Sequence, residues 1–151
     1  MTIDFLLAWM HHLCFLGMAA VLSMQWALLH PSRSTLPLGT LGRSDAWYGT
    51  LALLLLAVGA ARVAWGAKGP DFYLESPFFW AKIGVFLAVG AVSALPTINY
   101  LSWRKQARHA PDFQPSAAEI AKVRTAIRIQ AIGWLALPVL AAAMARGFGI
   151  S

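Results

Sequence analysis

Residues 5–28 of the chain read FLLAWMHHLCFLGMAAVLSMQWAL and contain no Asp, Glu, Lys or Arg. An α-helix needs about 20 mostly apolar residues to cross a bilayer, and a run this long without strand-like alternation indicates a helix. The length of the run, and Asp4 just before it, argue against a cleaved signal peptide. The stretch therefore predicts a first transmembrane helix that carries two adjacent histidines, His11 and His12.

The whole chain shares the apolar character of this segment. Its 151 residues are 59% hydrophobic and 12% charged, whereas soluble domains are about half apolar and a quarter charged. Three further apolar runs are long enough to span a membrane, near residues 47–66, 78–101 and 126–145. We therefore predict an all-α integral membrane protein, a four-helix bundle in which residues 1–151 form a single transmembrane domain.

Aromatic residues and capping patterns mark the ends of these spans. Six of the seven tryptophans lie at span ends, where membrane interfaces favour them: Trp9, Trp26, Trp47, Trp65, Trp80 and Trp103. Ser44–Asp45 is expected to cap the second helix, and Ser76–Pro77 the third. Residues 116–119 read as a capping box, so the fourth helix should begin near Ala117. Glycines within the spans are expected to permit close helix packing: Gly59, Gly84, Gly90 and Gly133.

The basic residues predict the orientation in the membrane. Most lie in the first and third connections or at the start of the fourth helix: Arg33, Arg43, Arg104, Lys105, Arg108, Lys122, Arg124 and Arg128. Four lie toward the other side: Arg62, Lys68, Lys82 and Arg146. The positive-inside rule then places both termini on the outer side. The net charge of +6 is explained by the basic residues that set the topology and that can contact the head groups of the lipid bilayer. We therefore expect no nucleic-acid partner.

Polar residues within the spans fall on helical stripes. Asp4, His11, Met18 and Gln25 are spaced by seven and share one face of the first helix. His12 is turned about 100° away from that face. The third helix carries a continuous face that should turn toward the bundle: Lys82, Phe86, Gly90, Ser93, Thr97, Tyr100 and Arg104.

The outer half combines His11, His12, Arg62 and Lys82, with no carboxylate near except Asp4. Positive charges that converge in low dielectric need an anion or a Lewis acid. A metalloporphyrin fits, because its iron takes a neutral imidazole and its propionates take Arg or Lys. We predict that these four residues bind haem b.

Of the two histidines we favour His11 as the ligand to the iron, because its stripe is the polar one. Lys82, Met144, water or no group would occupy the sixth position.

Simpler interpretations stay open for each of these residues. One histidine ring could bond a neighbouring helix while the other sits at head-group level, and Lys82 could snorkel to the interface. Arg62 lies beside Trp65 at the same boundary. The alternative function is therefore an accessory or structural subunit without a cofactor. A transporter is disfavoured, since we find no inverted repeat and expect no carboxylate inside the spans.

Several longer strings resemble a known family. RVAWGAKGPDFYLESPFFWAKIGVF (62–86), RSDAWYG (43–49), LPT (95–97) and HHL (11–13) resemble a bacterial family of small four-helix membrane proteins classed as a domain of unknown function. The resemblance covers nearly the whole chain. It implies the four-helix membrane fold and no activity. Together with the charge asymmetry of the connections, we expect a multi-pass protein of the bacterial inner (cytoplasmic) membrane with periplasmic termini.

A more distant resemblance concerns chemistry. MHHLCF (10–15) and FWAKIGVF (79–86) are similar to HemJ-type protoporphyrinogen oxidases and their CopD-like relatives. In that family a helix-one histidine and a helix-three lysine are implicated in haem b binding, which implies His11 or His12 and Lys82 here. SALPTINY (93–100) lacks the late helix-three histidine of HemJ proteins.

The resemblance therefore implies haem-based redox or electron transfer, with a quinone or another membrane redox protein as partner, rather than porphyrinogen oxidation. Whether the protein is an enzyme and whether it forms a homo-oligomer stay open.

Overall fold

A computed structural model describes residues 2–146 of the chain. Within this range the chain forms four long helices, one short helix and no β-strand: α1 (Thr2–Leu28), α2 (Leu38–Trp65), α3 (Gly69–Leu74), α4 (Pro77–His109) and α5 (Ala117–Ala145). Each of the four long helices is long and apolar enough to cross a membrane. The predicted all-α membrane class is confirmed, and the protein is a multi-pass membrane protein in contact with lipid.

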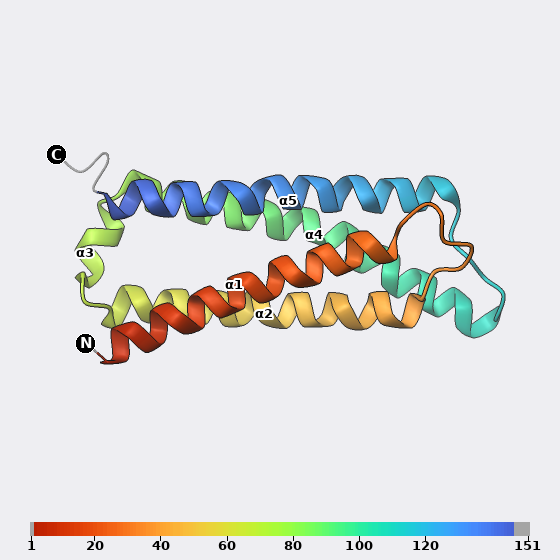
Figure 1. The fold of residues 1–151 in the computed structure, drawn as a ribbon, viewed down its shortest axis with the longest axis horizontal. Helices are drawn as coiled ribbons and strands as arrows, with labels where there is room; N and C mark the ends of the chain where they lie inside the picture. Colours follow the sequence, from red (N-terminus) through yellow and green to blue (C-terminus); the bar gives the residue numbers. More distant parts are fainter. Residues whose placement is uncertain (1, 147–151) are drawn as a thin grey trace.

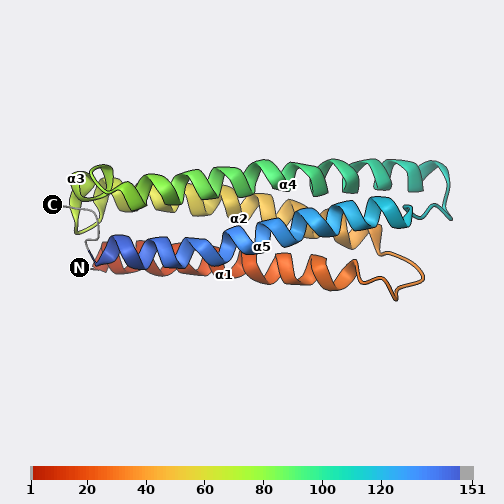
Figure 2. The same cartoon turned by 90° about the horizontal axis from the view of Figure 1, so that it is seen from above.

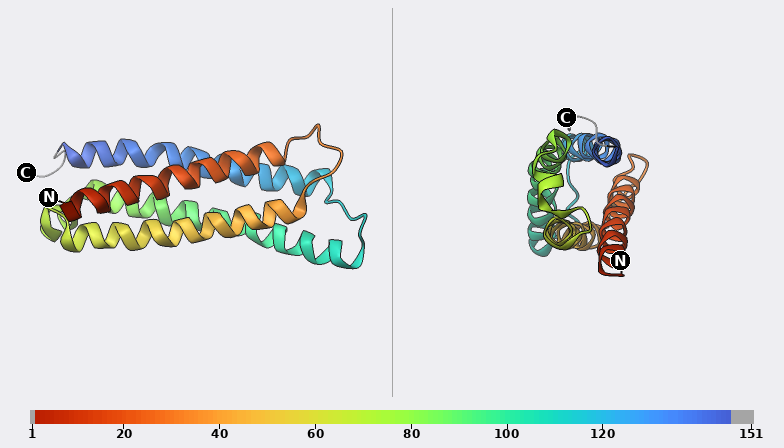
Figure 3. Two further views of the ribbon diagram at one scale, coloured as in Figure 1. Left: turned by 60° about the horizontal axis from the view of Figure 1, so that its bottom comes forward. Right: turned by 90° about the vertical axis from the view of Figure 1, so that its left-hand side faces the viewer.

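Successive long helices run in opposite directions (Figures 1 and 2). The main packing pairs are α1 with α2 and α4 with α5, while α2 contacts α4 and α1 contacts α5 less extensively. The end-on view in Figure 3 shows the four helices around a common axis. We call the end that carries α3 the α3 end, and the end with the connections 29–37 and 110–116 the basic end. The α1/α2 pair stands apart from the α4/α5 pair at the α3 end (Figure 1).

The predicted start of the second helix is wrong. α2 begins at Leu38, with Pro37 as its N-cap, so Ser44 and Asp45 lie inside the helix rather than at its cap. Ser44 is buried, and its hydroxyl donates to the Leu41 carbonyl oxygen (2.8 Å). Leu38 and Leu41 are also buried in the core. Burial of these side chains extends the helix past the local capping signal.

Other helix boundaries agree better with the sequence. Ser116 and Glu119 form the predicted capping box at the start of α5. Ser76 and Pro77 occupy the predicted N-cap and first helical positions of α4, although the Ser76 hydroxyl makes no capping bond. α4 continues to His109, beyond the predicted span, because Trp103 packs into the core. The short helix α3 was not anticipated.

The glycines expected to permit close packing differ in whether another helix lies against them. A side chain at Gly133 would collide with Val89, so α4 and α5 approach closely there, and a Cβ at Gly59 would lie 3.3 Å from Cε1 of His11. These two positions confirm the expected role in close packing. Gly84 and Gly90 have no neighbouring atom within 4 Å of such a Cβ, so the expectation is wrong for them, because both lie on open faces of α4.

Candidate functional site

His11 occupies the inward face of α1 in the half of the bundle near the α3 end. Its ring packs tightly against Gly59 of α2, where an added Cβ would lie 3.3 Å from Cε1 and 3.6 Å from Nδ1. Met18 and Gln25, which follow His11 at intervals of seven residues, are both buried. The predicted polar stripe of the first helix therefore does face the bundle.

His12 lies on a neighbouring face of α1, turned about 100° from His11, and is exposed. Its Nδ1 donates to the carbonyl oxygen of Ala8, one turn earlier (2.6 Å). The two imidazole centroids are 6.3 Å apart and their planes meet at 83°. The structure thus brings only one of the two adjacent histidines into the bundle.

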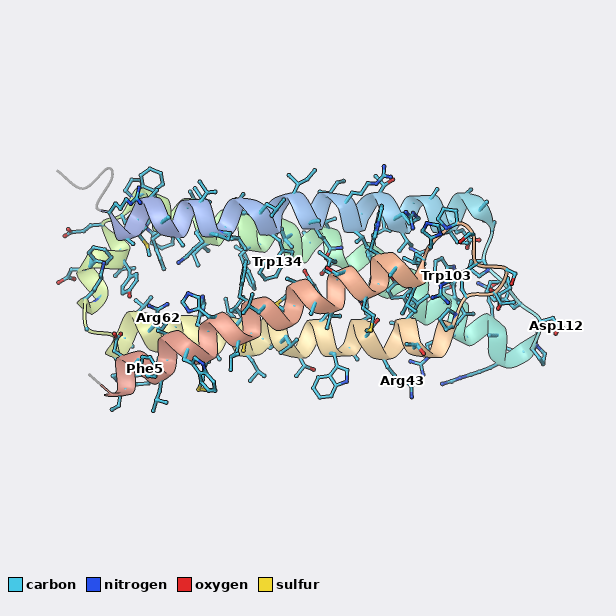
Figure 4. The ribbon with its side chains drawn as sticks, in the orientation of Figure 1. Phe5, Arg43, Arg62, Trp103, Asp112 and Trp134 are labelled. Atoms are coloured by element: carbon cyan, nitrogen blue, oxygen red, sulfur yellow. The ribbon has the colours of Figure 1, made fainter. Side chains whose placement is uncertain are left out.

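Arg62 of α2 and Lys82 of α4 join His11 near the α3 end. Figure 4 shows Arg62 extending from α2 toward the other helices. The charges of Arg62 and Lys82 both act on the His11 ring, and Arg62 also acts on Lys82. All three side chains are half-buried. We call these three residues, contributed by three helices, the outer cluster.

Two nitrogens of the outer cluster have no hydrogen-bond acceptor within residues 2–146. In this part of the chain, Nδ1 of His11 and Nε of Arg62 are both buried without a partner. The Leu55 carbonyl approaches the His11 ring but does not meet hydrogen-bond geometry with Nδ1. Asp4, the one acidic residue expected nearby, accepts instead from the backbone N–H of Ala67 (3.2 Å). Unpartnered buried polar groups are costly, so the cluster is suited to an anionic ligand.

The side-chain types of the outer cluster are those that hold a haem in other proteins. Haem iron takes a histidine nitrogen, and haem propionates pair with cationic side chains. The outer cluster offers one imidazole and two cations, and Met144 of α5 is buried near the same end.

The family model described as "Predicted membrane protein (DUF2214)" matches residues 3–149. The chain belongs to the DUF2214 family. This match covers α1 to α5 and confirms the predicted resemblance to a membrane family of unknown function. Neither a curated protein nor a solved structure matches the chain. The likeness of this DUF2214 protein to HemJ stays a prediction.

The inward position of Asp45 in this DUF2214 protein was not predicted from the sequence. It is half-buried inside α2, near Thr97, Tyr48 and Tyr100. Asp45 lies two residues before the predicted second span (47–66), so the expectation of no carboxylate inside the spans stays a prediction. The spacing of three between Asp45 and Tyr48, on one face of a helix, could have indicated that Asp45 points inward.

Proposed function

We propose that this DUF2214 protein binds haem b in the outer half of its bundle, with His11 as the residue that would hold the iron. The observation that carries the proposal is the buried, unpartnered Nδ1 of His11 beside the unpartnered Nε of Arg62. The electrostatic neighbours of His11 are all basic. A ligand that combines a Lewis acid with two carboxylates would satisfy this set of groups.

Each residue of the outer cluster has a separate part in the proposal. His11 would hold the haem iron through a ring nitrogen. Arg62 and Lys82 would pair with the propionates, and Lys82, Met144 or water would be the second ligand to the iron, with Arg62 alone pairing with the propionates where Lys82 is that ligand. When bound, haem supplies one-electron redox chemistry.

The proposal also gives the protein a location and a partner. The basic residues at the basic end favour an orientation with periplasmic termini in the bacterial inner membrane. The outer cluster would then lie in the periplasmic half, where a quinone or another membrane redox protein could exchange electrons with it.

The adjacent histidines provide a matched test. Wild type, His11→Ala and His12→Ala are purified with haem supplied, and bound haem is measured as the pyridine haemochrome. We expect His12→Ala to keep its haem, because His12 is exposed and bonded to Ala8. His11→Ala should lose haem while circular dichroism shows unchanged helicity.

Two outcomes would overturn the proposal. A wild-type protein that stays colourless after reconstitution binds no haem, and the accessory-subunit interpretation then replaces it. Equal haem content in the two histidine variants would exclude His11 as the ligand.

A further inference from the structure

A second group of polar side chains lies in the half of the bundle near the basic end. The Thr97 hydroxyl, which donates to the Ser93 carbonyl oxygen (3.1 Å), faces the Asp45 carboxylate from α4. Tyr48 and Tyr100 lie within electrostatic range of the same carboxylate. These contacts join α2 to α4 around one acidic group.

The helix register places two glutamines at the same level. Gly17 packs against Leu51 and His11 against Gly59, so the antiparallel α1 brings Gln25 level with residues 43–45 of α2. On α5, Trp134 donates from Nε1 to the hydroxyl oxygen of Tyr48 (2.8 Å).

Because α2 and α5 run parallel (Figure 1), Gln130 lies level with Ser44, one turn earlier on each helix. All four long helices thus contribute a polar side chain at this level. We call Asp45, Thr97, Tyr100, Gln25 and Gln130 the inner cluster.

The inner cluster is buried and incompletely bonded. Gln25, Gln130 and Tyr100 are only 2%, 1% and 1% exposed. Among the residues that the structure describes, Nε2 of Gln25 and the hydroxyl of Tyr100 have no hydrogen-bond partner. The oxygen and nitrogen of a glutamine amide can exchange places, so Gln25 can offer either an acceptor or a donor. Buried polar groups are normally satisfied, and these two call for a further partner.

Within residues 2–146, Asp45 has no basic partner. Arg43 is exposed and directed toward Thr40, and the Arg104 side chain runs against Gly42 instead. Arg128 is exposed and lies over the Trp26 ring, 5.1 Å from its centroid. Burial of a carboxylate without a counter-charge favours the uptake of a proton or the binding of a cation.

We propose that the inner cluster binds one monovalent cation, a proton or Na⁺, whose charge Asp45 balances. Hard cations prefer oxygen ligands, and the carboxylate, the Thr97 and Tyr100 hydroxyls and the glutamine amides all supply oxygen. The site is separate from the outer cluster and does not depend on haem.

Detergent-solubilised full-length protein distinguishes the two cations. Wild type, Asp45→Asn and the matched control Asp71→Asn, whose aspartate is exposed on α3, are compared. If Na⁺ is bound, NaCl raises the thermal midpoint of wild type and Asp71→Asn relative to choline chloride at equal ionic strength. Asp45→Asn should need at least about tenfold more Na⁺ for the same rise.

If a proton is bound, infrared spectra of wild type and Asp71→Asn in choline chloride show a carboxylic-acid C=O band that Asp45→Asn lacks. Absence of both the Na⁺ response and this band in wild type overturns the proposal, as does an Asp45→Asn variant that keeps either signal.

Tyr100→Phe is the second variant should Asp45→Asn fail to fold. It removes only the unpartnered hydroxyl and should weaken Na⁺ binding several-fold or shift the acid band. An unchanged result in Tyr100→Phe would contradict the proposal.

Discussion

The outer and inner clusters differ in charge although the same four helices build both. The outer cluster brings together an imidazole, a guanidinium and an ammonium, with no acidic neighbour of His11. In the inner cluster the Thr97 hydroxyl faces one carboxylate, Tyr100 lies near it, and two buried glutamines lie at the same level of the bundle. Each contains buried polar atoms without a partner. The outer cluster therefore has an excess of positive charge and the inner cluster an excess of negative charge. An anionic ligand would complete the first, and a cation would complete the second.

A layer of aromatic residues lies between the two clusters. Phe15 of α1 packs edge-on against Trp134 of α5, with ring centroids 4.5 Å apart, and Trp134 also bonds Tyr48 of α2. Figure 4 labels Trp134 between Arg62 near the α3 end and Trp103 near the basic end. Because this layer ties three helices together, opposite charges can be held apart within one small bundle.

The largest expected effect concerns which cluster faces which side of the membrane. A reporter fused after Ala110, in the connection before α5, should be cytoplasmic, and one after Lys68 should be outside, because the basic connections stay inside. Enzyme reporters active on only one side measure this as an all-or-none signal. The reverse pattern would invert the orientation and place the outer cluster near the cytoplasm.

The next effect tests whether the clusters are independent. His11→Ala should lose most of its haem and keep the cation response of wild type, whereas Asp45→Asn should keep its haem and lose that response. Haemochrome content and thermal midpoints in Na⁺ are measured on the same two preparations. Loss of both properties in either variant would mean that the two clusters act as one site.

The sequence predicts one cluster better than the other for a physical reason. His11 is placed correctly because a spacing of seven along α1 sets its face whatever the neighbouring helices do. Asp45 is misplaced because its local context reads as a cap, while the burial of Leu38 and Leu41 decides where α2 starts.

Other features of the structure depend on contacts that local patterns do not contain. The side chain of Gln114 accepts from the N–H of Leu36 (2.8 Å) and joins the two connections at the basic end. Likewise, the different surroundings of Gly90 and Gly133 follow from which helix lies opposite each residue. The unpartnered atoms of both clusters depend on such long-range packing as well.

A third prediction concerns the close contact of α4 with α5 near the aromatic layer. Gly133→Ala should destabilise the bundle by roughly 1–3 kcal/mol, because the added methyl meets Val89 and overpacks the interface. Gly90→Ala is the control: its Cβ would meet nothing, and alanine favours helix by about 1 kcal/mol. Reversible unfolding in denaturant and detergent measures both. Equal stability of the two variants would show that the α4–α5 contact is loose.

The smallest expected effect concerns the hydrogen bond within the aromatic layer. Trp134→Phe keeps an aromatic ring against Phe15 but removes the Nε1–H that donates to the Tyr48 hydroxyl. A net loss of about 1 kcal/mol is expected for one such bond, with a further loss for the smaller ring. Trp65→Phe is the matched control, since Trp65 is exposed and should change stability by less than about 0.5 kcal/mol. Tyr48→Phe in the Trp134→Phe background should then cost little more, because the bond is already gone. Additive losses in this double-mutant cycle would show that the bond contributes nothing, and that ring packing alone separates the basic cluster from the acidic one.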